Sequence, residues 1–154
     1  MTSIISTRAA GPLAAGVLLL LAMLAAPAVW AGPQHLRDGL AIGGYDAVGY
    51  FTEDRAVKGR AEFAYEWNGA AWHFASAGNR DQFAADPTAY APRYDGFCAY
   101  AAAQGAKADG DPEVWRIVDG KLYLNVSHRV QRRWERDIPG YVAKADAVWP
   151  SVNS

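Results

Sequence analysis

Two tight-turn signals constrain the fold of this chain more than any other feature. The first is Asn68-Gly69, which separates two stretches where large side chains alternate with smaller or polar ones: Phe63, Tyr65 and Trp67 before the turn, Trp72 and Phe74 after it. Asn-Gly favours the type I′ turn of a two-residue hairpin, and an alternation of period two is typical of a strand with one buried face. Residues 61–74 are therefore predicted to form an antiparallel β-hairpin in which His73 lies opposite Ala64.

A helix is predicted directly after this hairpin. Ser76 is a favourable N-cap residue, and Asp86-Pro87 marks the stop because proline cannot continue a helix. The predicted helix reaches about Ala85 and turns Phe83 inward.

A second unit follows the same plan. Residues 114–118 and 121–126 flank the turn signal Asp119-Gly120, and Ser127 is the next predicted N-cap. Large apolar residues then recur at i, i+4 and i+8, which predicts one face of a helix: Val130, Trp134 and Ile138. Two antiparallel hairpins, each followed by a helix, predict a single small α+β domain.

The segment between the two units holds the only cysteine of the chain, Cys98. Asp95 is predicted to be an N-cap and Gly105 the residue that ends the helix, so residues 97–104 form a short apolar helix with Cys98 in its first turn. Free backbone N–H groups of a first turn stabilise a thiolate, whereas burial among apolar neighbours disfavours it. Both outcomes stay open from the sequence.

The N-terminus has the order of a secretory signal peptide. Arg8 precedes an apolar run over residues 9–30, and small or tolerated residues end that run. We expect cleavage after Ala31, with Ala28 as the alternative, and the other interpretation of the run is an uncleaved membrane anchor. The expected organisation follows the same order along the chain: a signal peptide over residues 1–31, an N-terminal arm over residues 32–44 and a folded domain over residues 45–150.

Composition limits the partners of the mature protein. The formal net charge of the chain is −1, and so near a balance argues against a nucleic-acid-binding surface. One cysteine excludes an intramolecular disulfide, so packing of aromatic residues, of which the whole chain has 6 Trp and 8 Tyr, must supply the stability. We expect a protein of the periplasm or a secreted protein, with no stable membrane anchor after cleavage and with a metal ion or a periplasmic protein as its partner.

The residues from Trp72 to Tyr90 resemble the core of the YHS domain, a family associated with proteins that handle copper and other heavy metals. Seven spaced positions carry the resemblance: Phe74, Ser76, Gly78, Phe83, Asp86, Pro87 and Tyr90. Upstream, the stretch from Tyr45 to Phe51 is similar to the family's Asp-Pro-Val-Cys-Gly entry segment. The resemblance covers roughly residues 40–150 in element order.

The departures from that pattern concern the metal ligands. Where the metal-handling members have cysteines, this chain has Gly49, Ala75 and Asn79. Residues 96–100 instead resemble an exported subgroup of YHS-domain proteins in which selenocysteine sometimes stands at the position of Cys98. That resemblance implies a reactive chalcogen at this position.

The candidate site is therefore centred on Cys98, as a redox thiol or as a metal ligand together with His73, and copper is the cofactor that the resemblance implies. The polar and aromatic residues expected to line a pocket near this thiol are Tyr45, Asp46, Trp72, Tyr94 and Tyr100. The alternatives are a buried, inert cysteine, a solvated histidine beside Glu62 and Glu66, and aromatic residues that serve only the core.

Three functions remain open at this point. The first is an accessory protein in copper or heavy-metal homeostasis or in the associated redox stress, with Cys98 as the functional thiol. The second is a single-cysteine thiol redox protein, and the third is a non-catalytic binding or interaction module that has lost its metal ligands. Whether the protein is an enzyme stays open; because no further catalytic constellation accompanies the cysteine, a non-enzymatic role is favoured.

Overall fold

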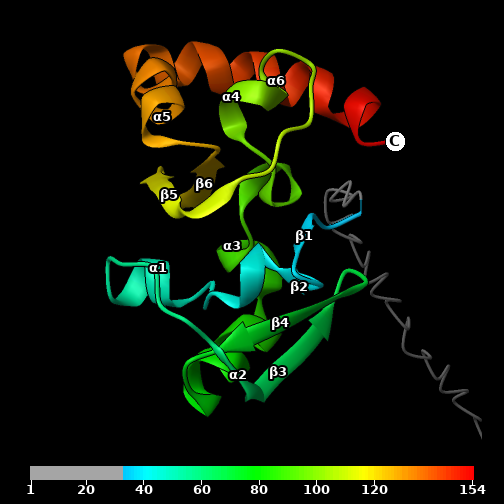
Figure 1. Ribbon diagram of the computed structural model, residues 1–154, viewed down its shortest axis with the longest axis vertical. Coiled ribbons are helices and arrows are strands. Elements are labelled where there is room, and N and C mark those ends of the chain that lie inside the picture. Colours follow the sequence, from blue (N-terminus) through cyan, green and yellow to red (C-terminus); the bar gives the residue numbers. More distant parts are fainter. Residues whose placement is uncertain (1–32) are drawn as a thin grey trace, which may run out of the picture.

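The computed structural model describes residues 33–154, so the expected signal peptide and both expected cleavage sites lie outside the described residues. The described chain contains two hairpins and several helices, which confirms the α+β fold class. The first unit lies below and the second unit above in Figure 1. Within residues 33–154, no helix combines the length and the apolar character that a membrane span requires.

The first unit is built on a four-stranded sheet with the order β1-β2-β4-β3. Its strands are β1 (Leu36–Arg37), β2 (Leu40–Ala41), β3 (Arg60–Trp67) and β4 (Ala70–Phe74). The predicted hairpin is confirmed: β3 and β4 pair antiparallel with Ala64 opposite His73, and both turn residues have positive φ, 52° at Asn68 and 69° at Gly69. The sheet also contains a parallel pair, Leu40 with Ala71, through which residues of the expected N-terminal arm join β4.

Short helices complete the first unit: the 3-10 helix η1 (Ile42–Gly44), α1 (Gly49–Thr52), α2 (Ala77–Ala85) and α3 (Pro87–Tyr90). The predicted cap of α2 is present, because the Ser76 hydroxyl accepts a hydrogen bond from the Asn79 N–H. Asp86 ends α2 and caps α3, with Pro87 in the first turn. Phe83 is fully buried, and its ring centroid lies 4.7 Å from that of Trp72.

The second unit holds the hairpin of β5 (Asp111–Val118) and β6 (Lys121–Asn125), followed by α5 (His128–Trp134), the 3-10 helix η3 (Glu135–Asp137) and α6 (Ile138–Val152). The turn at Asp119-Gly120 and the cap at Ser127 agree with the prediction. The single helix expected through Val130, Trp134 and Ile138 is wrong, because α5 ends at Trp134 and α6 begins at Ile138. Pro139 in the first turn of α6 lacks the N–H that a continuous helix needs, so the chain restarts there with Asp137 as the new N-cap.

The segment around Cys98 also differs from the prediction. It forms the 3-10 helix η2 (Arg93–Gly96) and a helix α4 limited to Ala99–Ala102, so Cys98 is the N-cap residue and does not lie in the first turn. Asp95 is not the cap: its carboxylate accepts hydrogen bonds from the Trp149 Nε1 and Asn153 Nδ2 atoms at 3.2 and 2.6 Å, which fastens the end of α6. The predicted end at Gly105 is confirmed, with φ of 70° and the two closing hydrogen bonds of a Schellman motif.

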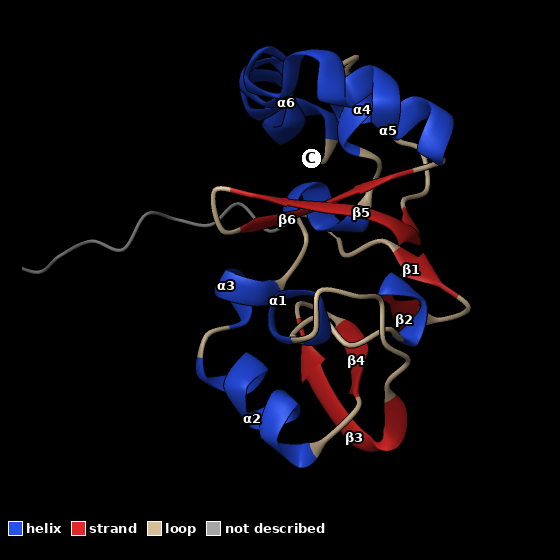
Figure 2. Cartoon of the chain, turned by 90° about the vertical axis from the view of Figure 1, so that its left-hand side faces the viewer, coloured by secondary structure: helices blue, strands red, loops and turns tan. Residues whose placement is uncertain are grey.

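The buried side chains form two clusters that share strand β6. Leu122 and Leu124 belong to the cluster of the first unit, whereas Tyr123 between them belongs to the cluster around Trp134 and Trp149. Because successive side chains of a strand point to opposite faces, β6 forms a wall common to both cores. Figure 2 shows the β5–β6 hairpin between the helices α4, α5 and α6 and the first unit.

Gly59 tests the close packing of the first sheet. A Cβ atom at this position would lie 2.3 Å from the backbone carbon and 2.4 Å from the carbonyl oxygen of His73. We expect Gly59→Ala to lower the free energy of unfolding by about 2–3 kcal/mol, the range of overpacked positions, because backbone atoms must shift. Urea unfolding followed by tryptophan fluorescence measures the change.

The matched control is Gly78→Ala on the exposed surface of α2, where the nearest atom to an added Cβ is the Ser76 hydroxyl at 3.8 Å. This substitution should be neutral or stabilise by up to about 1 kcal/mol. Equal effects of the two substitutions would contradict the packing that the structure describes.

Candidate functional site

Asp46 is a fully buried carboxylate at the centre of the first unit. Its Oδ1 atom accepts hydrogen bonds from the backbone N–H groups of Val48 at 2.9 Å and Gly49 at 3.2 Å. Its Oδ2 atom accepts from the Ala75 N–H at 2.8 Å and from the Asn79 side-chain amide at 2.7 Å. Four N–H donors thus compensate the desolvation of one buried charge.

Three of these four donors stand at positions where the YHS resemblance places cysteines. Gly49 opens α1, Ala75 follows β4 and Asn79 lies in the first turn of α2, and all three meet at the Asp46 carboxylate. The fold therefore brings the three positions together although none of them carries a thiol. The space of the expected thiolate cluster is filled by a hydrogen-bonded carboxylate, which we call the Asp46 clip.

The donor set of the Asp46 clip does not fit a soft metal ion. Soft cations such as Cu(I) select thiolate and thioether ligands, and the clip offers one carboxylate that is already surrounded by one side-chain amide and three backbone N–H groups. Binding a cation at Asp46 would also require breaking hydrogen bonds to both of its oxygens. Among residues 33–154, no group of three or more His, Cys, Asp and Glu side chains is arranged to hold a metal ion.

Cys98 lies apart from the Asp46 clip, against β6. Its side chain is fully buried, its backbone N–H donates to the Ala108 carbonyl at 2.8 Å, and it forms a parallel bridge with Leu124. The thiol donates to the Asn125 Oδ1 atom at a distance of 3.5 Å. The same oxygen accepts the Tyr100 N–H of α4 at 3.3 Å, so Asn125 takes over the capping role expected of Asp95.

The surroundings of the sulfur differ from those expected at a helix first turn. The Tyr100 N–H of α4 is directed at the Asn125 Oδ1 atom, and the thiol donates to that same oxygen. Complete burial also keeps reagents and redox partners from the sulfur. Cys98 therefore behaves in this structure as a small packed side chain.

His73, the second predicted metal ligand, is in strand β4 of the first unit and is half-buried. Its backbone pairs with Ala64 as predicted, while Glu62 on the neighbouring strand forms an ion pair with Arg60 at 3.0 Å. No contact joins His73 to Cys98 among the described interactions, so the structure does not bring the two predicted ligands together.

The five predicted pocket residues are spread over the two units. Trp72 packs in the first core, and Asp46 forms the clip. Tyr94 donates a hydrogen bond to Asp146, and Tyr100 packs edge-on against Tyr141. Burial and the nearby Asp146 carboxylate raise the pKa of Tyr94 far above its usual value, so this hydroxyl stays protonated.

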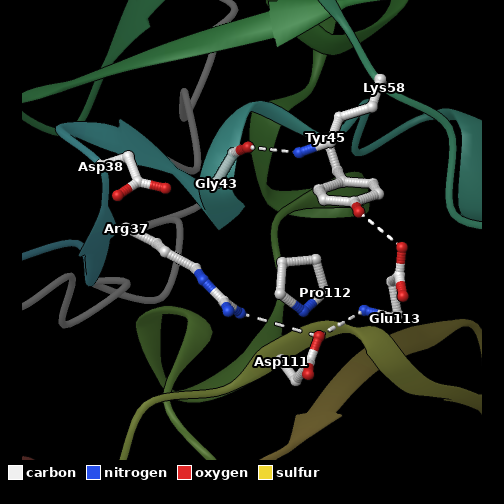
Figure 3. Close-up of a pocket in the computed structure, with 8 residues that line it drawn as sticks. All are labelled: Arg37, Asp38, Gly43, Tyr45, Lys58, Asp111, Pro112 and Glu113. Carbon is white, nitrogen blue, oxygen red and sulfur yellow. Dashed lines mark hydrogen bonds and ion pairs between the residues drawn. The ribbon is translucent and has the colours of Figure 1, made fainter.

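Tyr45 lines a polar cavity of about 270 Å³ between the two units (Figure 3). Its hydroxyl donates to the Glu113 Oε1 atom at 2.7 Å, and this hydrogen bond, together with burial and the negative charge of Glu113, raises the pKa of Tyr45. The other residues that line the cavity are Arg37, Asp38, Gly43, Lys58, Asp111, Pro112 and Glu113. Of the five predicted pocket residues, Tyr45 alone lines it, and Cys98 does not.

The first unit is also the part of the chain that matches a known family. Residues 48–94 match the YHS domain model. The matched residues run from α1 through β3, β4, α2 and α3 to Tyr94, so Gly49, Ala75 and Asn79 lie inside the YHS segment, whereas Asp46 and Cys98 lie outside it. No curated protein and no solved structure matches the chain.

Sequence analysis missed the charged residues of the cavity and the role of Asn125. Arg37 and Lys58 come from segments without periodicity, and Asp111 and Glu113 precede the strand that was predicted from residue 114. Asn125 is separated from Cys98 by 27 residues. No nearby sequence signal indicates that a side chain of one strand caps a helix so far away in the chain. Only the alternation at the start of β5, with Asp111 and Glu113 on one face, was a usable signal.

The Asp46 clip makes a stability prediction. In Asp46→Asn an amide NH₂ replaces one acceptor and faces N–H donors, so we expect the free energy of unfolding to fall by about 2–4 kcal/mol. The matched control is Asp81→Asn in α2, whose side chain is 67% exposed and pairs only with Arg80, and which should change stability by less than about 0.5 kcal/mol. An Asp46→Asn protein as stable as the control would contradict the clip.

The burial of Cys98 predicts its reactivity. In the folded protein, alkylation by iodoacetamide should be on the order of a hundredfold slower than in urea, because the sulfur becomes accessible only when the structure opens. Intact-mass spectrometry measures the rate. As an internal control, Ala143→Cys adds a thiol on the exposed surface of α6 that should react in the folded state while Cys98 does not. Rapid alkylation of native Cys98 would restore the redox hypothesis.

Proposed function

We propose that this protein is a non-catalytic binding module on a YHS scaffold, exported to the periplasm or secreted. The observation that carries the proposal is the Asp46 clip, in which Gly49, Ala75 and Asn79 direct hydrogen bonds at a buried carboxylate. In this arrangement the three positions stabilise the fold through hydrogen bonds to Asp46. The surface of the domain is then the part available for binding a partner. The signal-peptide pattern of residues 1–31 supports export.

The buried thiol supports the same proposal against the redox alternative. A thiol redox protein needs a sulfur that its substrate can reach and a surrounding that favours the thiolate. Cys98 is fully buried and donates to Asn125, so a substrate does not reach its sulfur in the folded state. The role that this geometry supports is packing between α4 and β6.

The polar cavity is direct support for a binding role. Its side chains come from both units, and several of them carry charges that are only partly compensated. Ligand sites are concave and often lie where structural units meet. The proposed partner is a small molecule or a periplasmic protein that presents charged groups to this cavity.

An accessory role in copper or heavy-metal handling is the second candidate. It is favoured by the match of residues 48–94 to the YHS domain, whose members are associated with metal handling. The side chains of the Asp46 clip fit a soft metal poorly, so such a role would depend on Cys98 or on a partner protein that supplies ligands.

Restoring the missing thiols tests the proposal. Ala75 donates its backbone N–H and Asn79 its side-chain amide to the same Asp46 oxygen, so Ala75→Cys/Asn79→Cys introduces two thiols at neighbouring positions of the fold. We expect this variant to bind Cu(I) on the order of tenfold or more tightly than the unchanged protein, measured by competition with a chromophoric Cu(I) chelator. Ala75→Ser/Asn79→Ser is the matched control and should bind no better than the unchanged protein.

Tight Cu(I) binding by the unchanged protein would contradict the proposal and favour the metal-handling role. In that case Cys98→Ser distinguishes the ligands, because a loss of binding would assign the metal to Cys98 and unchanged binding would place it elsewhere.

A further inference from the structure

The polar cavity has walls of opposite charge. Arg37 at the end of β1 and Lys58 before β3 belong to the first unit, and Asp111 and Glu113 belong to the opening of β5 in the second unit. Figure 3 shows the guanidinium of Arg37 directed towards Asp111, with Glu113 further along the same wall and Asp38 at the opposite end of the cavity. A ligand between the walls would meet Arg37 and Lys58, with Asp38 beyond Arg37, on the side of the first unit, and two carboxylates on the side of the second.

The charged side chains across the cavity do not use all of their hydrogen-bonding groups on one another. The closest approach of Arg37 to Asp111 is 3.7 Å, longer than a hydrogen bond, and the guanidinium is half exposed. Lys58 donates one long hydrogen bond of 3.3 Å to the Gly43 carbonyl and lies 3.9 Å from the centre of the Tyr45 ring. Both cations therefore retain N–H donors for a ligand.

The carboxylates retain acceptors in the same way. Asp111 Oδ1 accepts the Glu113 N–H at 3.0 Å, and Glu113 Oε1 accepts the Tyr45 hydroxyl at 2.7 Å. Within the described residues, Asp111 Oδ2 and Glu113 Oε2 have no hydrogen-bond donor. Tyr45 and the backbone thus hold one oxygen of each carboxylate and leave the other available.

The floor of the cavity is rigid and free of side chains that would fill it. Pro112 is fully buried, and its carbonyl accepts the Tyr50 hydroxyl at 2.8 Å, which links α1 to β5. Gly43 has φ of 60°, and a Cβ atom there would lie 3.4 Å from the Arg37 side chain and 3.6 Å from Pro112. The glycine therefore suits the turn and also preserves the open volume.

From these features we infer that the cavity binds a small zwitterion of the α-amino acid class, with its carboxylate on Arg37 and Lys58 and its ammonium group on Asp111 and Glu113. Guanidinium groups pair with carboxylates through two parallel hydrogen bonds. A ligand of one sign would leave the opposite wall uncompensated when it displaces water. The volume of about 270 Å³ is below the usual range of pockets for drug-sized ligands, so the ligand is smaller than these.

This inference deepens the proposed function and rests on it, since it names the ligand class of a non-catalytic module. It also concerns this chain in particular. Among the residues that line the cavity, Lys58 alone lies within the YHS segment of residues 48–94.

The test is a thermal-shift screen of the purified protein against the common α-amino acids, followed by isothermal titration calorimetry. We expect at least one amino acid to raise the melting temperature, because a ligand that contacts both units binds only the folded state. Its N-acetyl derivative, which lacks the ammonium group, and its amide, which lacks the carboxylate, should each bind at least about tenfold more weakly. No shift with any amino acid, or equal binding of the blocked derivatives, would overturn the inference.

Two variants locate the binding in the cavity. Arg37→Gln and Glu113→Gln remove one charge from each wall and should each weaken binding by about tenfold or more. Arg55→Gln is the matched control, because Arg55 is an exposed arginine that pairs with Glu53 outside the cavity, and it should bind as the unchanged protein does. Equal affinities of all three variants would also overturn the inference.

The result is separable from that of the proposed function. Suppose that Cys98 is alkylated slowly, Cu(I) binds weakly and no amino acid binds. The amino-acid inference would then be rejected, and the proposal of a non-catalytic module would be retained. Tight Cu(I) binding would remove the module whatever the calorimetry shows.

Discussion

The hydrogen bonds to the Asp46 carboxylate are the interaction on which the first unit depends. They join the start of α1, three residues after Asp46, to the end of β4 and the first turn of α2, which lie 29 and 33 residues further along the chain than Asp46. A buried charge is costly unless donors surround it, so the backbone of all three segments must be in place together. This requirement explains how a unit with a small sheet and short helices keeps one defined arrangement. It also places Gly49, Ala75 and Asn79 of the YHS segment against this carboxylate.

The second constraint is that strand β6 serves two cores. Leu122 and Leu124 face the first cluster, Tyr123 faces the second, and Asn125 at its end holds α4 through the Tyr100 N–H. A strand buried on both faces leaves no room for a mobile or accessible side chain beside it. The burial of Cys98 follows from this position, since its backbone bridges directly to Leu124. The burial of the thiol is thus a consequence of how the two units are joined.

The sequence correctly predicted those parts of the fold that depend on interactions between residues close together in the chain. The turns at Asn68-Gly69 and Asp119-Gly120, the cap at Ser76 and the helix end at Gly105 depend on residues within a few positions, and the structure confirms each of them. The failures involve long-range contacts. Asp95 looked like a cap but bonds to α6 more than 50 residues away, and the break before Ile138 depends on Pro139, which the apolar periodicity does not register. The grouping of the candidate site has the same origin. Cys98, His73 and the five expected pocket residues were grouped by their chemistry, and of these only Tyr45 lines the polar cavity.

The location of the polar cavity connects these observations. It lies where β1, η1 and the start of β5 meet, and the Tyr50 hydroxyl on Pro112 fixes the two units against each other at its floor. The charged residues there are exposed enough to be solvated, yet they are arranged with cations from one unit and carboxylates mainly from the other. A contact whose only task was to join the units would be more stable with close ion pairs or apolar side chains, because loosely paired charges in water contribute little. The 3.7 Å separation of Arg37 from Asp111 leaves both side chains partly solvated, which is the arrangement that the proposed zwitterion requires.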